Sequence, residues 1–153
     1  MLRWKAFAAS APDIAATGIR HLYRPDHGEV GLLATVDALG NPRIAPVCPI
    51  FTDDGIYLSV SAHTPKLRHL EQHGEYVLHA QVGADDEEFQ ISGEVRRVTQ
   101  TCELQTVIEA IRFASYNTAD PIFELLITRA LTVTWPNPDG PVKTAWTAPG
   151  TTG

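Results

Sequence analysis

The sequence has few cysteines that could form disulfides or bind zinc, and it has no long apolar segment that could anchor it in a membrane. Its two cysteines, Cys48 and Cys102, are too few for a disulfide framework or a cysteine-rich zinc site. No apolar run approaches the roughly 20 residues of a membrane-spanning helix. The opening segment MLRWKAFAASAPDIAATG also lacks the apolar core of a signal peptide. We therefore expect a soluble, cytoplasmic protein.

Positive charge is also scarce. Twelve basic side chains stand against eighteen acidic ones, which gives a net charge of −6. This balance argues against a nucleic-acid partner or an anionic membrane surface, because both require a basic face. The chain contains neither the G-x-S-x-G nucleophile motif nor a glycine-rich nucleotide loop. These absences exclude the most easily recognised hydrolases and nucleotide-binding folds.

What remains is the composition of an ordinary globular protein. With 153 residues, 44% of them hydrophobic, the chain suits one domain with its own core. We expect this domain to span residues 1–150 and to end in a flexible tail at 149–153. Within it, the sequence predicts an N-terminal helical segment at 1–27, barrel strands at 28–98, and a helix with closing strands at 101–148.

The local patterns predict mainly β structure with flanking helices. A first helix starts at Ser10 or Asp13 and runs to about Tyr23. The following strand, EVGLLATVD, has an apolar run that predicts burial on both faces. Short turns join it to RIAPVCPIF and IYLSVS, so these three segments are expected to form an antiparallel meander. Further strands at 76–82, 88–99, 130–135 and 142–147, with a helix at 102–115, indicate a small antiparallel barrel.

The segment SVSAHTPKLRHLEQHG changes from a strand into a helix at Thr64, Pro65 and Lys66. Thr64 suits the N-cap, Pro65 suits the first helical position, and Gly74 suits the end of the helix. Lys66 is different, because a cation in the first turn opposes the helix dipole by roughly 0.3–1 kcal/mol. A bound anion would reverse that sign. Two interpretations are open: a solvated lysine on a capped helix, or a lysine that binds phosphate.

Arg43 favours the second interpretation. Arg43, Ala45 and Val47 would share one strand face, where the small Ala45 leaves room for a flat ring. Ser59 and Ser61 would offer hydroxyl groups from the neighbouring strand. Such a set suits a planar cofactor with a phosphate tail, although a surface arginine on a strand is the simpler account of Arg43 alone.

Three segments together carry a family resemblance: GLLATVDALGNPRIAPV, DDGIYLSVSAHTPKLRHL and EFQISGEVRRV. In this order, over about Glu29 to Val98, they resemble the pyridoxamine 5′-phosphate oxidase-like proteins. The resemblance implies a split β-barrel homodimer that binds FMN at the subunit interface and acts as an oxidoreductase on a small substrate. It implies a phosphate site at Arg43 and Lys66, helped by Thr64, with the other residues lining the ribityl chain and ring. The full implied set is Arg43, Ile44, Ala45, Pro46, Val47, Ser59, Val60, Ser61, Thr64, Pro65 and Lys66.

The sequence also departs from this family's pattern. The family's name-giving enzyme uses a late arginine and histidine for its substrate, but here Arg129 is the last arginine and His79 the last histidine. We therefore expect no pyridoxamine-phosphate oxidase reaction, and no late histidine to ligate haem. The deazaflavin coenzyme in the same groove, or a non-catalytic flavin-binding dimer, remains an alternative. The flavin-contacting amide position falls on Gln90 or Glu88, and no catalytic acid or base is assigned.

The remaining candidates favour structural roles. His69 and His73 are four residues apart on the predicted helix, but no third metal ligand is evident. The acidic run from Asp85 to Glu88 is typical of a solvated loop, so we expect no metal site. Cys48 lies between two prolines and is expected to be a buried structural thiol. The three tryptophans are expected to be core or interface anchors: Trp4, Trp135 and Trp146.

Overall fold

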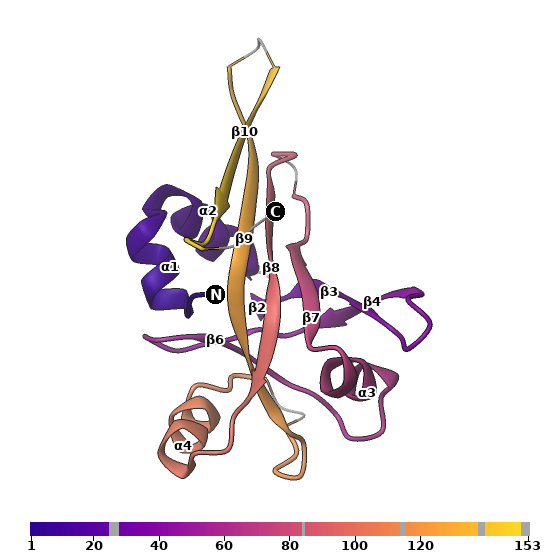
Figure 1. Cartoon of the computed structure of the whole chain (residues 1–153). Helices are drawn as coiled ribbons and strands as arrows, with labels where there is room; N and C mark the ends of the chain where they lie inside the picture. The colour runs from indigo at the N-terminus through magenta and orange to yellow at the C-terminus, as the bar shows by residue number, and fades with distance from the viewer. Residues whose placement is uncertain (25–27, 84, 114–115, 138–139, 151–153) are drawn as a thin grey trace.

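The computed structural model describes residues 1–24, 28–83, 85–113, 116–137 and 140–150. Eight strands form one antiparallel sheet (Figure 1). They are β3 (Gly31–Val36), β4 (Pro42–Val47), β5 (Ile50–Phe51), β6 (Ile56–Ser59), β7 (Glu75–Ala80), β8 (Glu88–Arg97), β9 (Ile122–Asn137) and β10 (Gly140–Thr147). The strand order is β4–β3–β7–β8–β9–β6–β5, and β10 pairs with β9. A separate pair consists of β1 (Tyr23–Arg24) and β2 (Gly28–Glu29).

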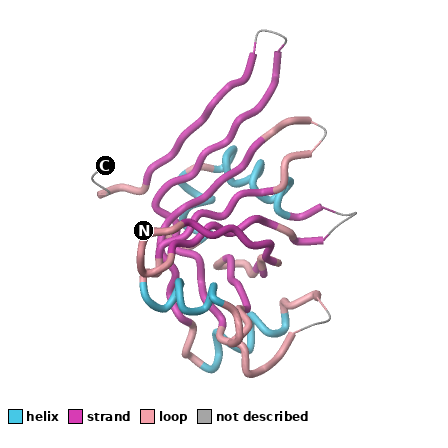
Figure 2. The backbone as a smooth tube through the Cα atoms, turned by 90° about the vertical axis from the view of Figure 1, so that its right-hand side faces the viewer, coloured by secondary structure: helices cyan, strands magenta, loops and turns pink. Residues whose placement is uncertain are grey.

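The long strand β9 organises the sheet. One edge of β9 pairs with β8, and the other edge pairs first with β6, then with Leu2 through a bridge at Ile127, and finally with β10. Beyond its pairing with β8, β9 continues with β10 as a hairpin that projects from the sheet (Figure 2). A bulge interrupts the β8–β9 pairing at Gly93, where a Cβ atom would lie 1.9 Å from the Leu126 carbonyl oxygen. Glycine is therefore required for the two backbones to approach this closely.

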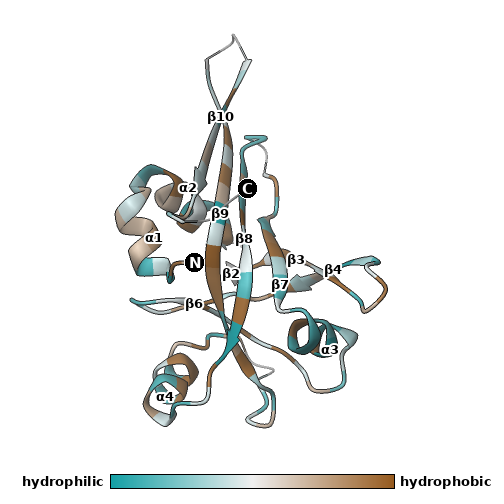
Figure 3. Ribbon diagram, in the orientation of Figure 1, coloured by the Kyte–Doolittle hydropathy of each residue, from teal (hydrophilic) through white to brown (hydrophobic). Residues whose placement is uncertain are grey.

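The described ranges contain four helices: α1 (Trp4–Ser10), α2 (Pro12–Leu22), α3 (Pro65–Gln72) and α4 (Thr101–Glu109). Helices α1 and α2 lie together on one side of the molecule, while α3 lies near β3 and β7 at its other side (Figure 1). The apolar side chains Phe7 and Leu22 of the first two helices are fully buried. In contrast, α3 is mostly hydrophilic and anchors itself through Leu70 and His69 (Figure 3).

The core lies on one face of the curled sheet. Along β3, Gly31, Leu33 and Thr35 are buried, whereas the alternating residues are only half-buried. The prediction that this strand is buried on both faces was therefore wrong for the chain by itself. A strand with one buried face alternates in exposure even where its sequence is continuously apolar.

The structure confirms the predicted fold class of a β sheet with flanking helices, and corrects its details. Strand β6 pairs with β9 and β5, not with β4, so the predicted three-strand meander is wrong. The short strand β5 forms an antiparallel pair with β6, and this pair lies at the opposite end of the strand order from β4. Helix α1 was not predicted, and β9 begins at Ile122, eight residues before the predicted Ala130. Part of the predicted tail, residues 151–153, lies outside the described residues.

Candidate functional site

The start of α3 has an incomplete cap. Thr64 occupies the N-cap and Pro65 the first helical position, as predicted, and Gly74 follows the helix with a φ of 72°. The Thr64 hydroxyl, however, donates to the Ser61 carbonyl at 2.9 Å and accepts no hydrogen bond from the helix. The prediction that this hydroxyl caps the helix is therefore wrong. Pro65 has no N–H group and the Leu67 amide donates to the Thr64 carbonyl at 3.2 Å, so the Lys66 amide is the first-turn donor available to an anion among the described residues.

Lys66 is a half-buried cation in this first turn. Burial lowers the pKa of its ammonium group, and the nearby Cys48 thiol raises it by a smaller amount. Lys66 forms no ion pair with any carboxylate in the described part of the chain. A cation that loses water without gaining a partner destabilises the protein, and an anion bound beside it would remove this cost. Cys48 itself is exposed, so its predicted role as a buried thiol is wrong.

Arg43 faces α3 from β4 instead of facing β6. It lies opposite Thr35 in the β3–β4 register, so Arg43, Ala45 and Val47 share the face on which β3 is buried. Arg43 lines a cavity of about 500 Å³ between the β3–β4 turn and α3. The other lining residues are Asp37, Ala38, Leu39, Asn41, Pro42, Pro65, Arg68, His69 and Gln72. Pro65 and Arg68, on either side of Lys66 in the sequence, line this cavity, whereas Lys66 itself is not among its lining residues.

Arg68 is a further cation that the sequence analysis missed. It lies three residues after Pro65, a spacing that returns to the same helical face and could have indicated it. Among the described residues, Arg43 and Arg68 form no ion pair, whereas the arginines elsewhere at Arg3, Arg20, Arg96 and Arg97 each bind a carboxylate. Lys66, Arg43 and Arg68 thus lie on or beside α3 without a carboxylate partner, as Arg112, Arg129 and Lys143 do elsewhere in the described part of the chain.

The remaining predicted residues divide between two environments. Ile44 and Pro46 alternate with Arg43 and Ala45, so they point to the outer face of the sheet, where Ile44 is 68% exposed. The Val60 side chain is fully buried, and its amide donates to the Pro121 carbonyl at 3.0 Å. Val60 is therefore a core residue that can meet a ligand only through its backbone.

Ser59 and Ser61 flank Val60 at the end of β6. Ser59 is half-buried, and Ser61 is exposed where it accepts the Thr64 hydroxyl hydrogen bond. The structure thus joins Ser61, Thr64, Pro65 and Lys66 in one segment, with Arg43 across the cavity. It does not place β6 beside β4 in the sheet.

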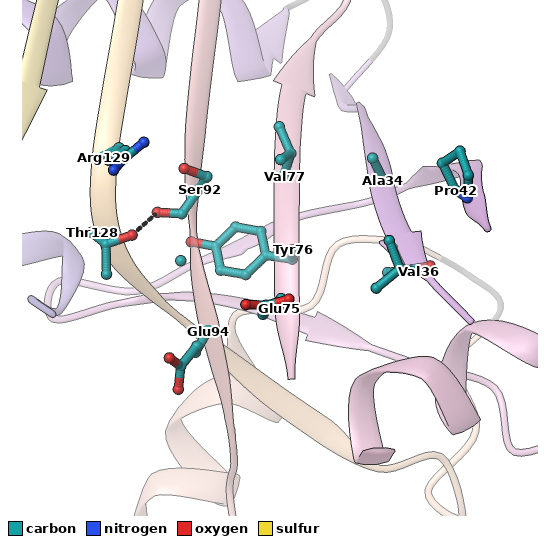
Figure 4. A pocket seen from close by; sticks show the side chains of 12 residues that line it. Ala34, Val36, Pro42, Glu75, Tyr76, Val77, Ser92, Glu94, Thr128 and Arg129 are labelled. Carbon is teal, nitrogen blue, oxygen red and sulfur yellow. Dashed lines mark hydrogen bonds between the residues drawn. The ribbon is translucent and has the colours of Figure 1, made fainter. Parts of the chain in front are cut away.

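The outer face of the sheet is hollowed over β3, β7, β8 and β9. The hollow has a volume of about 490 Å³, and Figure 4 shows Ala34, Val77, Ser92 and Arg129 across its four strands. The Thr128 hydroxyl, at the bulge, donates to the Ser92 carbonyl at 3.0 Å. Gln90 and Glu88, the two candidates for the flavin-contacting position, are both half-buried and alternate along β8 with buried residues, so both share the outer face with Ser92.

Two other polar clusters hold the fold together. The carboxylate of Glu124 is completely buried and accepts hydrogen bonds from Arg3 and Arg96, which also bind Glu103. The ligand atoms of His21, Asp85 and Glu87 lie within 4.8 Å of one another. Glu87 already accepts hydrogen bonds from Arg20 and His21, so we interpret this group as an ion-paired tie between α2 and the β7–β8 loop.

Comparisons with known proteins identify the fold. No family model and no curated protein matches the sequence. Among solved structures, a haem-binding protein from Mycobacterium smegmatis is 17% identical with a TM-score of 0.61, over 77% of this chain and 52% of that one. PhzG from Burkholderia lata, in complex with tetrahydrophenazine-1-carboxylic acid, is 9% identical with a TM-score of 0.57, over 94% and 92%. A putative pyridoxamine 5′-phosphate oxidase from Listeria innocua is 11% identical with a TM-score of 0.55, over 70% and 90%.

These similarities define the architecture as the split barrel of pyridoxamine 5′-phosphate oxidase-like proteins, as the sequence resemblance predicted. The chain spans about half the length of the haem-binding protein that it matches. None of the helices within the described ranges is long and apolar enough to cross a membrane.

Proposed function

We propose that this protein binds FMN at the start of α3 and acts as an oxidoreductase on a small substrate. The observation that carries the proposal is Lys66, a half-buried ammonium group that lacks a carboxylate partner among the described residues. Its own backbone amide lies in the first turn of α3, where no side chain caps the helix. A phosphate group would neutralise the ammonium and accept a hydrogen bond from the Lys66 amide.

The edge strand β4 offers a place for the rest of the cofactor. β4 pairs only with β3 in the described sheet, so backbone donors and acceptors line its other edge. Ala45 is small and half-buried beside the buried Val47, while Arg43 borders the α3 cavity at the beginning of the strand. The flavin would supply the electron and hydride chemistry, and the protein would supply binding and orientation. We assign no catalytic acid or base.

We further propose that two copies of the chain associate through the outer face of the sheet. This face carries the hollow of about 490 Å³ and the exposed side chain of Ile44. Apolar surface of this kind is typical of protein–protein contacts. A solution mass equal to one chain at micromolar concentration would contradict this association.

The first test is the absorption spectrum of the purified protein, followed by titration with FMN and with riboflavin. FMN and riboflavin share the ring and the ribityl chain, so a large preference for FMN isolates the phosphate contact. We expect FMN to bind at least tenfold more tightly than riboflavin. Equal affinities would contradict the phosphate site, and failure to bind either would contradict the proposal.

The same experiment separates the alternatives. A deazaflavin spectrum and no affinity for FMN would assign the deazaflavin coenzyme. A Soret band would indicate haem, which the similar Mycobacterium smegmatis protein is described as binding. Flavin binding without turnover of common reductants or acceptors would indicate a non-catalytic flavin-binding dimer.

A further inference from the structure

Three side chains of metal-binding type meet between the end of α2 and the β7–β8 loop. His21 lies in the last turn of α2, and Asp85 and Glu87 lie in the loop that leads into β8. One ligand atom of each lies within 4.8 Å of the other two, and no other such trio of His, Cys, Asp or Glu occurs in the described part of the chain. Nothing in the sequence places His21 beside the acidic run, which is why we expected no metal site there.

The loop holds both carboxylates near the histidine by its own hydrogen bonds. Asp86, which lies between them, has a φ of 53°, a conformation that few residues other than glycine adopt. The Asp86 amide donates to the Gly83 carbonyl at 3.2 Å, and the Trp135 indole donates to the Asp86 carbonyl at 3.0 Å. The Asp85 carboxylate also accepts a hydrogen bond from the Glu87 amide at 3.3 Å. The two carboxylates are thus preorganised, and an ion would not have to order the loop.

His21 and Glu87 form the enclosed side of this group. His21 is only 3% exposed, and its Nε2 atom lies 2.9 Å from Oε2 of Glu87. A tetrahedral zinc ion, about 2.0–2.1 Å from each atom, would set these atoms roughly 3.3 Å apart, so a small shift makes room for it. The ion would take the place of the proton on Nε2, and the ring would carry its proton on Nδ1.

The charges near the histidine favour a cation. Two carboxylates, Asp85 and Glu87, stand against the single guanidinium group of Arg20, which binds Oε2 of Glu87 at 2.6 Å. The Arg20 side chain is 57% exposed, so it can turn into water and leave this oxygen to an ion without becoming a buried, unpaired charge. In the metal-free protein the same groups form the ion-paired tie described above.

We propose that His21, Asp85 and Glu87 bind a divalent transition-metal ion, of which zinc is the best match. Zinc accepts imidazole and carboxylate ligands together in fourfold coordination, with water in the remaining position. Magnesium and calcium prefer oxygen ligands alone. The bound ion would tie α2 to the β7–β8 loop. This site is independent of the proposed flavin site, because α3 precedes β7 whereas the loop follows its end, and α2 and α3 lie on opposite sides of the molecule (Figure 1).

The test titrates zinc chloride into the chelator-treated full chain by calorimetry, with the imidazole NMR signals of His21 as a second readout. We expect saturable binding that shifts these signals, and no competition from an excess of magnesium. Asp85→Asn should weaken zinc binding tenfold or more, because losing even a group that only supports a metal ligand costs ten- to a hundredfold. Asparagine keeps the oxygen that accepts the Glu87 amide, and Asp85 is exposed, so the variant should fold as the parent does.

Asp86→Asn is the matched control. It removes the same charge from the same loop, and asparagine tolerates a positive φ, but the Asp86 carboxylate is outside the group of three. This variant should bind zinc as tightly as the parent protein.

Three results would overturn the proposal. Zinc that binds without shifting the His21 signals would lie elsewhere, for example at the exposed Cys48 or Cys102. Equal losses of affinity in Asp85→Asn and Asp86→Asn would mean that the loop attracts cations only through its overall charge. Displacement of zinc by an equal concentration of magnesium would mean that the imidazole is not a ligand. Each result is independent of whether the protein binds FMN.

Discussion

Replacing Lys66 with methionine should have opposite effects on the free protein and on the FMN complex. Methionine keeps a long, flexible side chain but removes the charge. In the free protein the charge opposes the α3 dipole and is partly buried without a described carboxylate partner. Removing it should raise the free energy of unfolding by about 0.3–1 kcal/mol through the dipole alone. For a chain of this size, this corresponds to a rise in Tm of roughly 1–4 °C.

The FMN complex should respond in the other direction. A hydrogen bond to a charged group contributes roughly 1.5–3 kcal/mol. Lys66→Met should therefore weaken FMN binding about ten- to a hundredfold. Riboflavin binding should stay unchanged, because riboflavin has no phosphate. Isothermal titration with both ligands measures the difference directly.

The pH dependence gives an independent check. Burial lowers the Lys66 pKa in the folded protein, so the unfolded chain binds this proton more tightly than the native state does. The free energy of unfolding of the cofactor-free protein should therefore rise with pH, between the depressed native pKa and the ordinary value near 10.5. FMN affinity should fall over the same range as the ammonium loses its proton.

Lys143→Met is the matched control, because Lys143 is an exposed lysine on β10. It should leave the thermal stability, the FMN affinity and the alkaline slope unchanged. Lys66→Met with unaltered FMN affinity would refute the phosphate assignment. A cofactor-free variant that is less stable than the parent protein would refute the argument from burial.

Three further predictions concern the fold. Glu124→Gln should lower the free energy of unfolding by about 1.5–3 kcal/mol in urea denaturation, because it removes the charge that accepts hydrogen bonds from two arginines at a fully buried position, while both arginines keep Glu103. Glu71→Gln, in an exposed ion pair, should cost less than about 1 kcal/mol, and equal losses would contradict the argument. Gly93→Ala should destabilise the protein by about 1–3 kcal/mol or more, measured by thermal unfolding, because its methyl group meets the Leu126 carbonyl; wild-type stability would refute this. A hydrogen bond from Arg96 on β8 is the main cause of the lowered pKa of Glu103. The ionised Glu103 carboxylate therefore stabilises the folded protein, and this stabilisation should be lost as the pH falls through the lowered pKa. Glu103→Gln should make the free energy of unfolding less dependent on pH in the acid range, and an unchanged dependence would contradict this role of Glu103.

The local parts of the fold could be predicted from the sequence because their signals are local. Gly74 marked the end of α3, and Thr64 and Pro65 marked its start, since cap positions depend on neighbouring residues. The partner of β6 depends instead on β9, which lies more than sixty residues later. Short turns favour pairing between consecutive strands, which predicts that β4 pairs with β6. Here the short strand β5 lies between them in the sequence and pairs with β6 instead. The missed helix α1 has no side-chain N-cap to mark its start.

In the candidate site, too, features with local sequence signals could be predicted, and contacts between distant residues could not. The sequence identified Lys66 from its conflict with the helix dipole, and the structure adds that its ammonium group is half-buried. Arg68 was missed because its spacing after Pro65 indicates a shared helical face but does not indicate what lies opposite that face. Its importance comes from the cavity that α3 forms with the β3–β4 turn. His69 was considered only as a metal ligand, since its contact with Thr35 joins residues 34 positions apart.

The position of β9 has a consequence for protein synthesis. This strand is synthesised after Leu2, β6 and β8, yet it pairs with all three and with β10. A nascent chain that ends before Ile122 can form the β3–β4 hairpin and the β7–β8 ladder, but β6 and β8 have no strand between them. Because contacts across long sequence separations form slowly, the unfinished chain must keep these edges unpaired until β9 has been synthesised. We therefore expect C-terminal truncations within β9 to yield aggregating fragments instead of smaller folded domains.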